Sequence, residues 1–234
     1  IVLDSDVVLP ETYMQHVLDE IKREPCDAFG GPDRAHHDFS PIQKAISYSM
    51  TSFFTTGGIR GGKKKLDKFY PRSYNMGIKS DVYKALNGFS KMRFGEDIDF
   101  SIRIFDNGYS CRLFPEAWVY HKRRTDFRKF FKQVYNSGIA RINLYKKYPS
   151  SLKLVHLLPA VFTVGVFLLC LSALLLCSFV PLSLLLLYSI LIFIDSATHY
   201  KSIKIGFLSV GAAFTQLMGY GLGFIEAWWK RCVR

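Results

Sequence analysis

Asp4 and Asp6 are the first residues whose types and spacing could do chemistry, because they follow the apolar run Ile1–Leu3 directly. Such residues favour a strand. We expect both carboxylates at the end of a buried parallel strand, the edge where open α/β sheets bind ligands. Two carboxylates one residue apart repel each other unless a cation lies between them. A divalent ion carrying a phosphate or diphosphate would serve. An Asp-rich turn without a ligand is the alternative for this pair taken alone.

A second acidic pair, Glu96 and Asp97, precedes a helix that we expect to run through Ile102. Carboxylates in the first turn of a helix are stabilised by the helix dipole, which is the structural interpretation of this pair. The functional interpretation requires the chain to fold back, so that both acidic pairs share one cleft. This spatial relation is the central expectation from the sequence.

The elements that must position these side chains follow from periodicity and from capping residues. We expect helices over about 11–22, 41–54 and 80–86, and strands over about 26–31 and 109–120, the last ending in His121. Ser80 is a suitable start and Gly88 a suitable stop for the third helix. Between the second and third helices, paired glycines and a lysine run predict a mobile loop over Thr55–Arg72. It is either a solvated turn or a flap that meets phosphates or anionic lipid.

The chain changes character near Ser151, where a charged, aromatic-rich portion gives way to a long apolar one. Within 152–229 the charged residues are Lys153, Asp195, Lys201, Lys204 and Glu226. Because a membrane-spanning helix needs about 20 apolar residues, we expect two or three transmembrane helices, over about 154–179, 181–197 and 205–229. These runs follow the polar portion, so they are not a signal peptide.

The net charge of +12 is concentrated in the polar portion. Lys and Arg beside the first apolar run place that portion in the cytoplasm. The sequence therefore predicts a multi-pass protein of the inner (cytoplasmic) membrane, with its polar domain facing the cytoplasm. Three spans would put the tail residues Lys230, Arg231 and Arg234 on the far side, against the same rule. Either one apolar segment is re-entrant or interfacial, or the short tail is tolerated there.

Residues 126–150 form a third region between the polar domain (1–125) and the membrane region (151–234). Apolar side chains recur along Asp126–Tyr148 at helical spacing, opposite a face rich in Lys and Arg. A basic amphipathic helix beside a membrane span is typical of an interfacial helix. Packing entirely against the protein is the alternative. The five cysteines are scattered without a Cys-x-x-Cys pair, which indicates reduced thiols with packing roles.

In these ordered features the chain resembles a membrane-anchored family 2 glycosyltransferase of bacterial type, with the GT-A fold for nucleotide-diphospho-sugars. Leu3-Asp4-Ser5-Asp6 is similar to the family's Asp-x-Asp at the end of a strand. Gly95-Glu96-Asp97 is similar to the Glu-Asp pair that supplies the catalytic base. His121, which closes a strand after Pro115, is similar to the histidine that adds a metal ligand in many GT-A enzymes.

Two further segments carry the resemblance. Asn75-Met76-Gly77 and Asn87-Gly88-Phe89 are similar to the turns that line the donor-sugar and acceptor pockets. Gln133 to Arg141 resembles the Gln-x-x-Arg-Trp element of processive polysaccharide synthases only loosely, since no Trp follows Arg141. The resemblance leaves the role of Arg141, and processivity, open.

The fold class implied by the resemblance is α/β: the C-terminal part of a GT-A domain, followed by two or three transmembrane helices. In the family the Asp-x-Asp strand lies near the middle of the catalytic domain, whereas here it comes first. We therefore expect a fragment that lacks its N-terminal half, has no complete nucleotide pocket and is inactive alone.

The resemblance also implies the chemistry. An inverting transferase would move a sugar from a nucleotide-diphospho-sugar to a lipid-linked or glycan acceptor in cell-envelope glycan (polysaccharide) synthesis, with membrane lipids and no nucleic acid as partners. Asp4, Asp6 and His121 would hold Mn²⁺ or Mg²⁺. Asp97 would be the base and Glu96 would orient the acceptor or hold the helix start. Asn75, Gly77, Arg124 and Arg141 would join Asp4 and Asp6 on the donor-sugar and diphosphate side, and Asn87, Gly88 and Phe89 would lie on the acceptor side.

Two other functions fit parts of the sequence. In a haloacid-dehalogenase-type phosphatase, Asp4 would be the phosphorylated nucleophile and Asp6 the general acid. That family's second acidic pair follows a hydrophobic strand, whereas Lys91-Met92-Arg93 precedes Gly95-Glu96-Asp97 here. A non-catalytic basic membrane protein that binds anionic lipid or nucleic acid would gain nothing from paired carboxylates, which repel such ligands.

Overall fold

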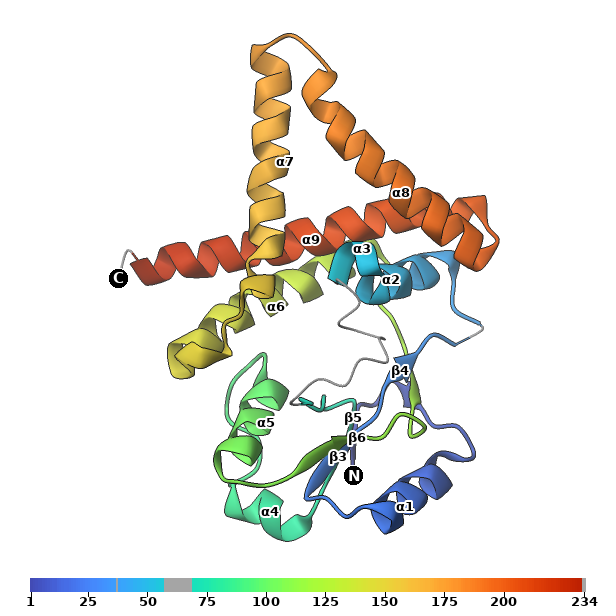
Figure 1. Ribbon diagram of the computed structural model, residues 1–234, viewed down its shortest axis with the longest axis vertical. Helices are drawn as coiled ribbons and strands as arrows, with labels where there is room; N and C mark the ends of the chain where they lie inside the picture. Colours follow the sequence, from blue (N-terminus) through green and yellow to red (C-terminus); the bar gives the residue numbers. More distant parts are fainter. Residues whose placement is uncertain (37, 57–68, 233–234) are drawn as a thin grey trace. The chain divides into compact units, whose positions relative to one another are not determined.

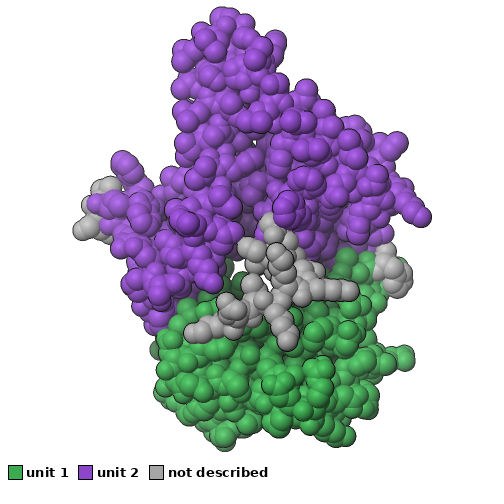
Figure 2. All heavy atoms as spheres, viewed as in Figure 1, with its two compact units in different colours: residues 1–38, 61–122 green, residues 39–60, 123–234 purple. Residues whose placement is uncertain are grey.

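The computed structural model describes residues 1–36, 38–56 and 69–232, which form short strands and long helices (Figure 1). The chain divides into two compact units, coloured separately in Figure 2. Unit 1 comprises Ile1–Asp38 and Gly61–Lys122, and unit 2 comprises Phe39–Arg60 and Arg123–Arg234. The paired glycines and the lysine run of the loop expected over Thr55–Arg72 lie outside the described residues.

Unit 1 contains two small mixed sheets. The first has the order β1-β5-β3-β6 and consists of β1 (Val2–Leu3), β5 (Asn75–Ile78), β3 (Ala28–Gly30) and β6 (Cys111–Leu113). The second has the order β2-β7-β4 and consists of β2 (Val7–Val8), β7 (Val119–His121) and β4 (Asp33–Arg34). The β3–β6 and β4–β7 pairs are parallel, and the other pairs are antiparallel. The segment Asp4–Asp6 therefore joins one sheet to the other.

Two expectations about strands were wrong in detail. β1 pairs antiparallel with β5, and it lies at the edge of the sheet formed by the described residues, with Leu3 38% exposed. The strand expected over 109–120 is two strands, β6 and β7, which belong to different sheets. The chain turns between them around Pro115, where the backbone N–H of Ala117 donates to the carbonyl of Phe114. Alternation of apolar residues alone does not reveal such a turn.

Three helices of unit 1 cover the sheets. They are α1 (Tyr13–Arg23), α4 (Ser80–Ala85) and α5 (Glu96–Asp106), close to the expected bounds. Tyr13 and Val17 of α1 pack with Phe29 and Phe114, whose rings stack at 4.4 Å. A second core joins α4 and α5 to β3 and β5, and it contains Ala28, Met76, Val82, Leu86, Phe100 and Ile104.

Unit 2 consists of helices. They are α2 (Pro41–Thr51), α3 (Phe53–Thr56), α6 (Phe127–Lys147), α7 (Leu158–Leu175), α8 (Ser183–Tyr200) and α9 (Ile203–Cys232), with 3-10 turns at Pro149–Ser151, Leu154–His156 and Val180–Leu182. The helix expected over 41–54 is interrupted at Ser52, whose backbone is extended. α6 begins where the Asp126 carboxylate accepts a hydrogen bond from the backbone N–H of Lys129.

Three helices of unit 2 are long and apolar enough to cross a membrane: Leu158–Leu175, Val180–Tyr200 and Ile203–Cys232. They match the three apolar runs of the sequence and indicate membrane association. The apolar face of α6 is covered within unit 2: Phe130 and Val134 pack with α2 and α9, and Ile142 packs with Phe224.

Candidate active site

Asp4, Asp6 and His121 come together in unit 1 where the chain passes from β1 to β2. The β2–β7 register places His121 opposite Val7, and the backbone N–H of Lys122 donates to the Asp6 carbonyl at 3.1 Å. One ligand atom from each of the three side chains lies within 4.8 Å of the others. His121 Nε2 is 3.2 Å from Asp6 Oδ1. The structure therefore groups the three residues that the sequence predicted as metal ligands.

The Tyr74 ring and the Asp33 carboxylate lie on the other side of the His121 ring, whose buried Nδ1 has no hydrogen-bond partner among the described residues. The Tyr74 ring stacks on the imidazole with centroids 4.7 Å apart. Its hydroxyl donates to Asp33 Oδ1 at 3.3 Å, and Asp33 Oδ2 is 3.8 Å from His121 Nδ1. The parallel pairing of β4 with β7 brings Asp33 to this position. A carboxylate behind a metal-binding histidine commonly fixes the ring orientation.

Glu96 and Asp97 lie at the start of α5, after Gly95 in the left-handed conformation with φ +84°. Glu96 Oε2 is buried, and no hydrogen-bond partner for it occurs among the described residues. Burial raises the pKa of Glu96 most, and the negative charges of Asp97 and Asp4 raise it further, against the Arg72 charge. The segment that carries Arg72 links this pair to the first one: Leu3 pairs with Asn75, and the backbone N–H of Asn75 donates to the Arg72 carbonyl.

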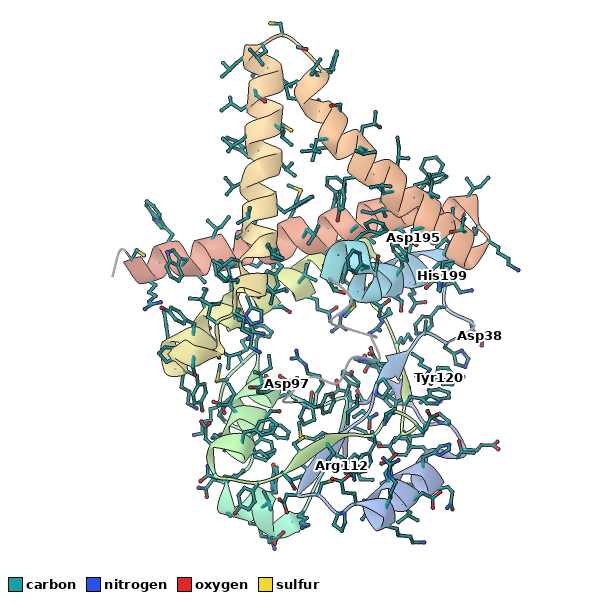
Figure 3. The ribbon with its side chains drawn as sticks, viewed as in Figure 1. Asp38, Asp97, Arg112, Tyr120, Asp195 and His199 are labelled. Atoms are coloured by element: carbon teal, nitrogen blue, oxygen red, sulfur yellow. The ribbon has the colours of Figure 1, made fainter. Side chains whose placement is uncertain are left out.

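Asp97, labelled in Figure 3, is mostly buried and held on both carboxylate oxygens. Oδ1 accepts from the backbone N–H of Ile98 at 2.7 Å, and Oδ2 is 3.4 Å from Arg72 Nη1. The Ser101 hydroxyl donates to the Asp97 carbonyl and also lies within hydrogen-bond distance of the Pro71 carbonyl. These contacts fix the start of α5 against the segment that carries Arg72.

The turn Asn87–Phe89 follows α4 with two positive φ angles, +55° at Asn87 and +60° at Gly88. Arg103 of α5 donates to the Leu86 carbonyl at 2.6 Å and to the Gly88 carbonyl at 2.7 Å. Its guanidinium also bonds the fully buried Asp99 at 3.0 Å. The predicted acceptor-side turn is thus tied to the same helix that carries the second acidic pair.

Asn75 and Gly77, expected on the donor side, have structural contacts in β5. The Asn75 amide is fully buried: Oδ1 accepts from the Tyr13 hydroxyl at 2.7 Å, and Nδ2 donates to the Ala117 carbonyl at 2.8 Å. A Cβ added at Gly77 would lie 1.9 Å from the Phe29 ring. Both residues therefore shape the backbone near the site through packing.

Arg124 and Arg141 belong to unit 2, whereas the other predicted site residues belong to unit 1. Arg124 is exposed and Arg141 half-buried on α6. Their predicted contact with a donor diphosphate stays a prediction.

Four residues that support the site were not predicted from the sequence: Asp33, Arg72, Tyr74 and Arg103. Their contacts come from pairings between segments far apart in the chain. Arg103 follows Asp99 by four residues, and this helical ion-pair spacing is the one local signal for any of the four.

The donor set of Asp4, Asp6 and His121 fits a hard divalent cation. The two carboxylates offer the oxygen ligands that Mg²⁺ and Mn²⁺ favour, and the imidazole nitrogen tilts the set towards Mn²⁺. The ligand atoms lie within 4.8 Å of one another, and Mg²⁺ bonds of about 2.0–2.1 Å would bring them to within about 4.2 Å.

Comparison with known families gives a match to the model described as Glycosyl transferase family group 2 over residues 1–194. The matched span includes every residue of the candidate site in unit 1. It extends through α6, α7 and most of α8. A search of curated proteins found no significant match.

Proposed function

The chain belongs to glycosyl transferase family group 2, and from this premise we propose that it moves a sugar from a nucleotide-diphospho-sugar to a lipid-linked acceptor, with inversion at the anomeric carbon. Family membership supports a glycosyl transfer role. It favours this function over the phosphatase and the non-catalytic lipid-binding alternatives. The donor, the acceptor and the role in cell-envelope glycan synthesis are parts of the proposal.

In this proposal Asp4, Asp6 and His121 hold Mn²⁺ or Mg²⁺ near the donor diphosphate. Such an ion, when bound, neutralises the charge that develops on the leaving diphosphate. Asp33 and Tyr74 keep the His121 ring in position for this task. Arg124 and Arg141 are candidates for further contacts with the diphosphate.

Asp97 is the proposed base. It takes the proton from the acceptor hydroxyl as that oxygen attacks the anomeric carbon, and the bond from this carbon to the diphosphate oxygen breaks on the opposite face. The contact with Arg72 holds the Asp97 carboxylate at the start of α5. Glu96 has a buried oxygen without a partner among the described residues, so it is suited to bind a second acceptor hydroxyl.

The turn Asn87–Phe89 is the proposed acceptor wall, since Arg103 ties it to α5. Asn75 and Gly77 act indirectly on the donor side, by setting the course of β5 beside β1. The apolar helices support a lipid-linked acceptor, because a membrane-associated enzyme meets such a substrate at the surface where it resides. Basic residues flanking these helices favour the cytoplasmic side of the inner membrane.

The observation that carries the proposal is a set of contacts leading from one acidic pair to the other. Leu3, next to Asp4, pairs with Asn75, whose backbone N–H donates to the Arg72 carbonyl at 3.0 Å. The Arg72 guanidinium is 3.4 Å from the Asp97 carboxylate. Sugar transfer requires a base and a diphosphate-binding group at the two ends of one reacting centre. The chain separates these residues by more than ninety positions, and the contacts of Arg72 support their placement at one site.

The test is sugar transfer by Asp97→Asn in membranes that contain the full-length protein. Labelled sugar from a panel of nucleotide-diphospho-sugars is followed into lipid-extractable product with Mn²⁺ present. We expect a loss of about 10²–10⁴-fold in rate, with donor binding retained. Asp81→Asn, an exposed carboxylate in the first turn of α4, is the matched control and should behave as wild type. An Asp97→Asn enzyme with normal turnover would refute the assignment of the base.

A further inference from the structure

The third apolar helix, α9, differs from the other two in how far protein covers it. In its most apolar 18-residue window, 44% is buried within the protein, compared with 6% for Leu158–Leu175 and 11% for Val180–Tyr200. A helix in the hydrocarbon core is surrounded by lipid and leaves its apolar side chains open to it. The three helices therefore do not have the same surroundings, and α9 is also the least apolar of them, with a mean hydropathy of 1.3 against 2.4 and 2.0.

α6 runs alongside α9 in the same direction over most of its own length. Phe127 lies at Gly211, Val134 lies at Gly219, and the Tyr145 ring stacks on Trp228 with centroids 5.9 Å apart. The contacts advance together along both helices. From Phe127 to Tyr145 they extend over about 27 Å at 1.5 Å per residue.

Glycines fix this pairing at close range. A Cβ added at Gly223 would lie 2.1 Å from the carbonyl oxygen of Tyr135, and one added at Gly138 would lie 2.2 Å from that of Tyr220. Small residues spaced in this way let two helix backbones approach each other. The position of α9 relative to the bilayer therefore also sets the position of α6.

α6 cannot lie within the hydrocarbon core, because its other face is basic. Its exposed cations are Arg128, Lys129 and Lys132 near the start and Lys146 and Lys147 at the end, and half-buried Arg141 lies between the two groups. Each Lys or Arg at the bilayer centre costs roughly 2.5–3.5 kcal/mol on insertion scales. If α9 crossed the membrane, α6 would enter the membrane with it.

α7 and α8, unlike α6, have no basic face. Within unit 2 they rise as a hairpin from one side of α9, whereas α6 and α2 lie on its other side (Figure 1). From Leu154 to Ile194 the sequence has no Asp, Glu, Lys or Arg. Asp195 marks the end of this run, and its carboxylate accepts a hydrogen bond from the Tyr48 hydroxyl of α2, so the C-terminal end of α8 returns to the polar helices (Figure 3).

We propose that α9 lies in the plane of the membrane surface and that only α7 and α8 enter the hydrocarbon. An exposed apolar stripe along α9, formed by Phe207, Leu222, Ile225 and Trp229, then contacts the boundary between lipid headgroups and acyl chains. The chain enters through α7 and returns through α8, so Lys230 and Arg231 stay on the side of the residues that precede α7. This topology removes the conflict with the positive-inside rule that three spans create.

Depth measurement in proteoliposomes of phosphatidylcholine and phosphatidylglycerol tests the proposal. Nitroxide labels are attached to single cysteines in a variant without the five native ones, and accessibility to oxygen and to a water-soluble nickel complex gives their depth. Leu222→Cys in α9 and Leu168→Cys in α7 are a matched pair, since both leucines are exposed. We expect Leu222→Cys at headgroup depth and Leu168→Cys near the bilayer centre. Equal, central depths for both would overturn the proposal.

A second readout uses native Cys232, the last described residue of α9, and therefore needs no substitution in the helix. A membrane-impermeant maleimide is applied to one side of sealed vesicles. Cys232 should react from the same side as a cysteine introduced at the exposed Lys22 of α1, in the polar portion. Reaction of the two from opposite sides would show that α9 crosses the membrane.

Discussion

Unit 1 and unit 2 hold their functional surfaces by different means. Unit 1 has strands of two to four residues, and charged pairs such as buried Asp99 with Arg103 tie its turns and helices together. The four long helices described in unit 2, α6 to α9, have 18 to 30 residues and contact one another through apolar side chains and glycines. Strands this short have little stability of their own. The positions of the turns and helices in unit 1 therefore depend on individual polar contacts, whereas those of the helices in unit 2 depend on close packing.

The largest expected effect comes from removing one carboxylate of unit 1. Asp6→Asn takes a ligand from the group of Asp4, Asp6 and His121. We expect Mn²⁺ affinity to fall by more than about 100-fold, since changes behind the ligands alone typically cost 10–100-fold. Calorimetric titration with Mn²⁺ measures this. Asp19→Asn, an exposed carboxylate on α1, should bind Mn²⁺ as wild type does.

Gly223→Ala tests the dependence of unit 2 on close helix packing. The added Cβ would lie 2.1 Å from the Tyr135 carbonyl oxygen, so α6 and α9 must separate. We expect a loss of about 1–3 kcal/mol in unfolding free energy, the usual range for overpacking. Thermal unfolding in detergent measures the change. Gly165→Ala is the matched control: nothing lies within 4 Å of a Cβ there, so it should be neutral or slightly stabilising.

Asp33→Asn tests how far the site in unit 1 depends on one supporting carboxylate. Asp33 accepts a hydrogen bond from Tyr74 and lies behind His121. Without its charge we expect Mn²⁺ affinity to decrease by about 10–100-fold, while the unfolding temperature changes little. An unchanged affinity would mean that the stacked Tyr74 ring alone orients His121.

The smallest effect is expected at the edge of unit 1. Hydrogen bonds from Lys79 first, and from Ser110, lower the pKa of Asp27 to about 2. A lowered pKa adds stability that is complete above the unfolded value of about 3.9 and is lost as pH falls towards 2. The Lys79 side chain is half exposed. Asp27→Asn should therefore cost no more than about 1 kcal/mol near pH 7, and the difference from wild type should vanish near pH 2.

The helices could largely be predicted from the sequence, because their signals are local. Apolar spacing and caps gave the positions of α1, α4, α5 and α6, and apolar length gave three candidate membrane helices. The direction of β1 could not be predicted, since strand propensity says nothing about which strand it pairs with. The division of residues 109–120 into β6 and β7 could not be predicted either, since propensity does not show that the two strands pair in different sheets.

The candidate site was partly predictable. Asp4, Asp6 and His121 stand out by residue type and by their places at strand ends, and the structure groups them. Asp33 and Tyr74 did not stand out, because the pairing of β4 with β7 brings them in from distant segments. The cover of α9 by α6 was equally hidden, since the glycines of α9 show that something can approach closely but not which helix does so.

The central proposal is that both acidic pairs of unit 1 belong to one site. Paramagnetic broadening by bound Mn²⁺ tests it most directly, through the ¹³C carboxyl signals of labelled aspartate and glutamate in the detergent-solubilised protein. We expect sub-stoichiometric Mn²⁺ to broaden the signals of Glu96 and Asp97 together with those of Asp4 and Asp6, while Asp81 stays sharp. Broadening of Asp4 and Asp6 with sharp signals from Glu96 and Asp97 would contradict it.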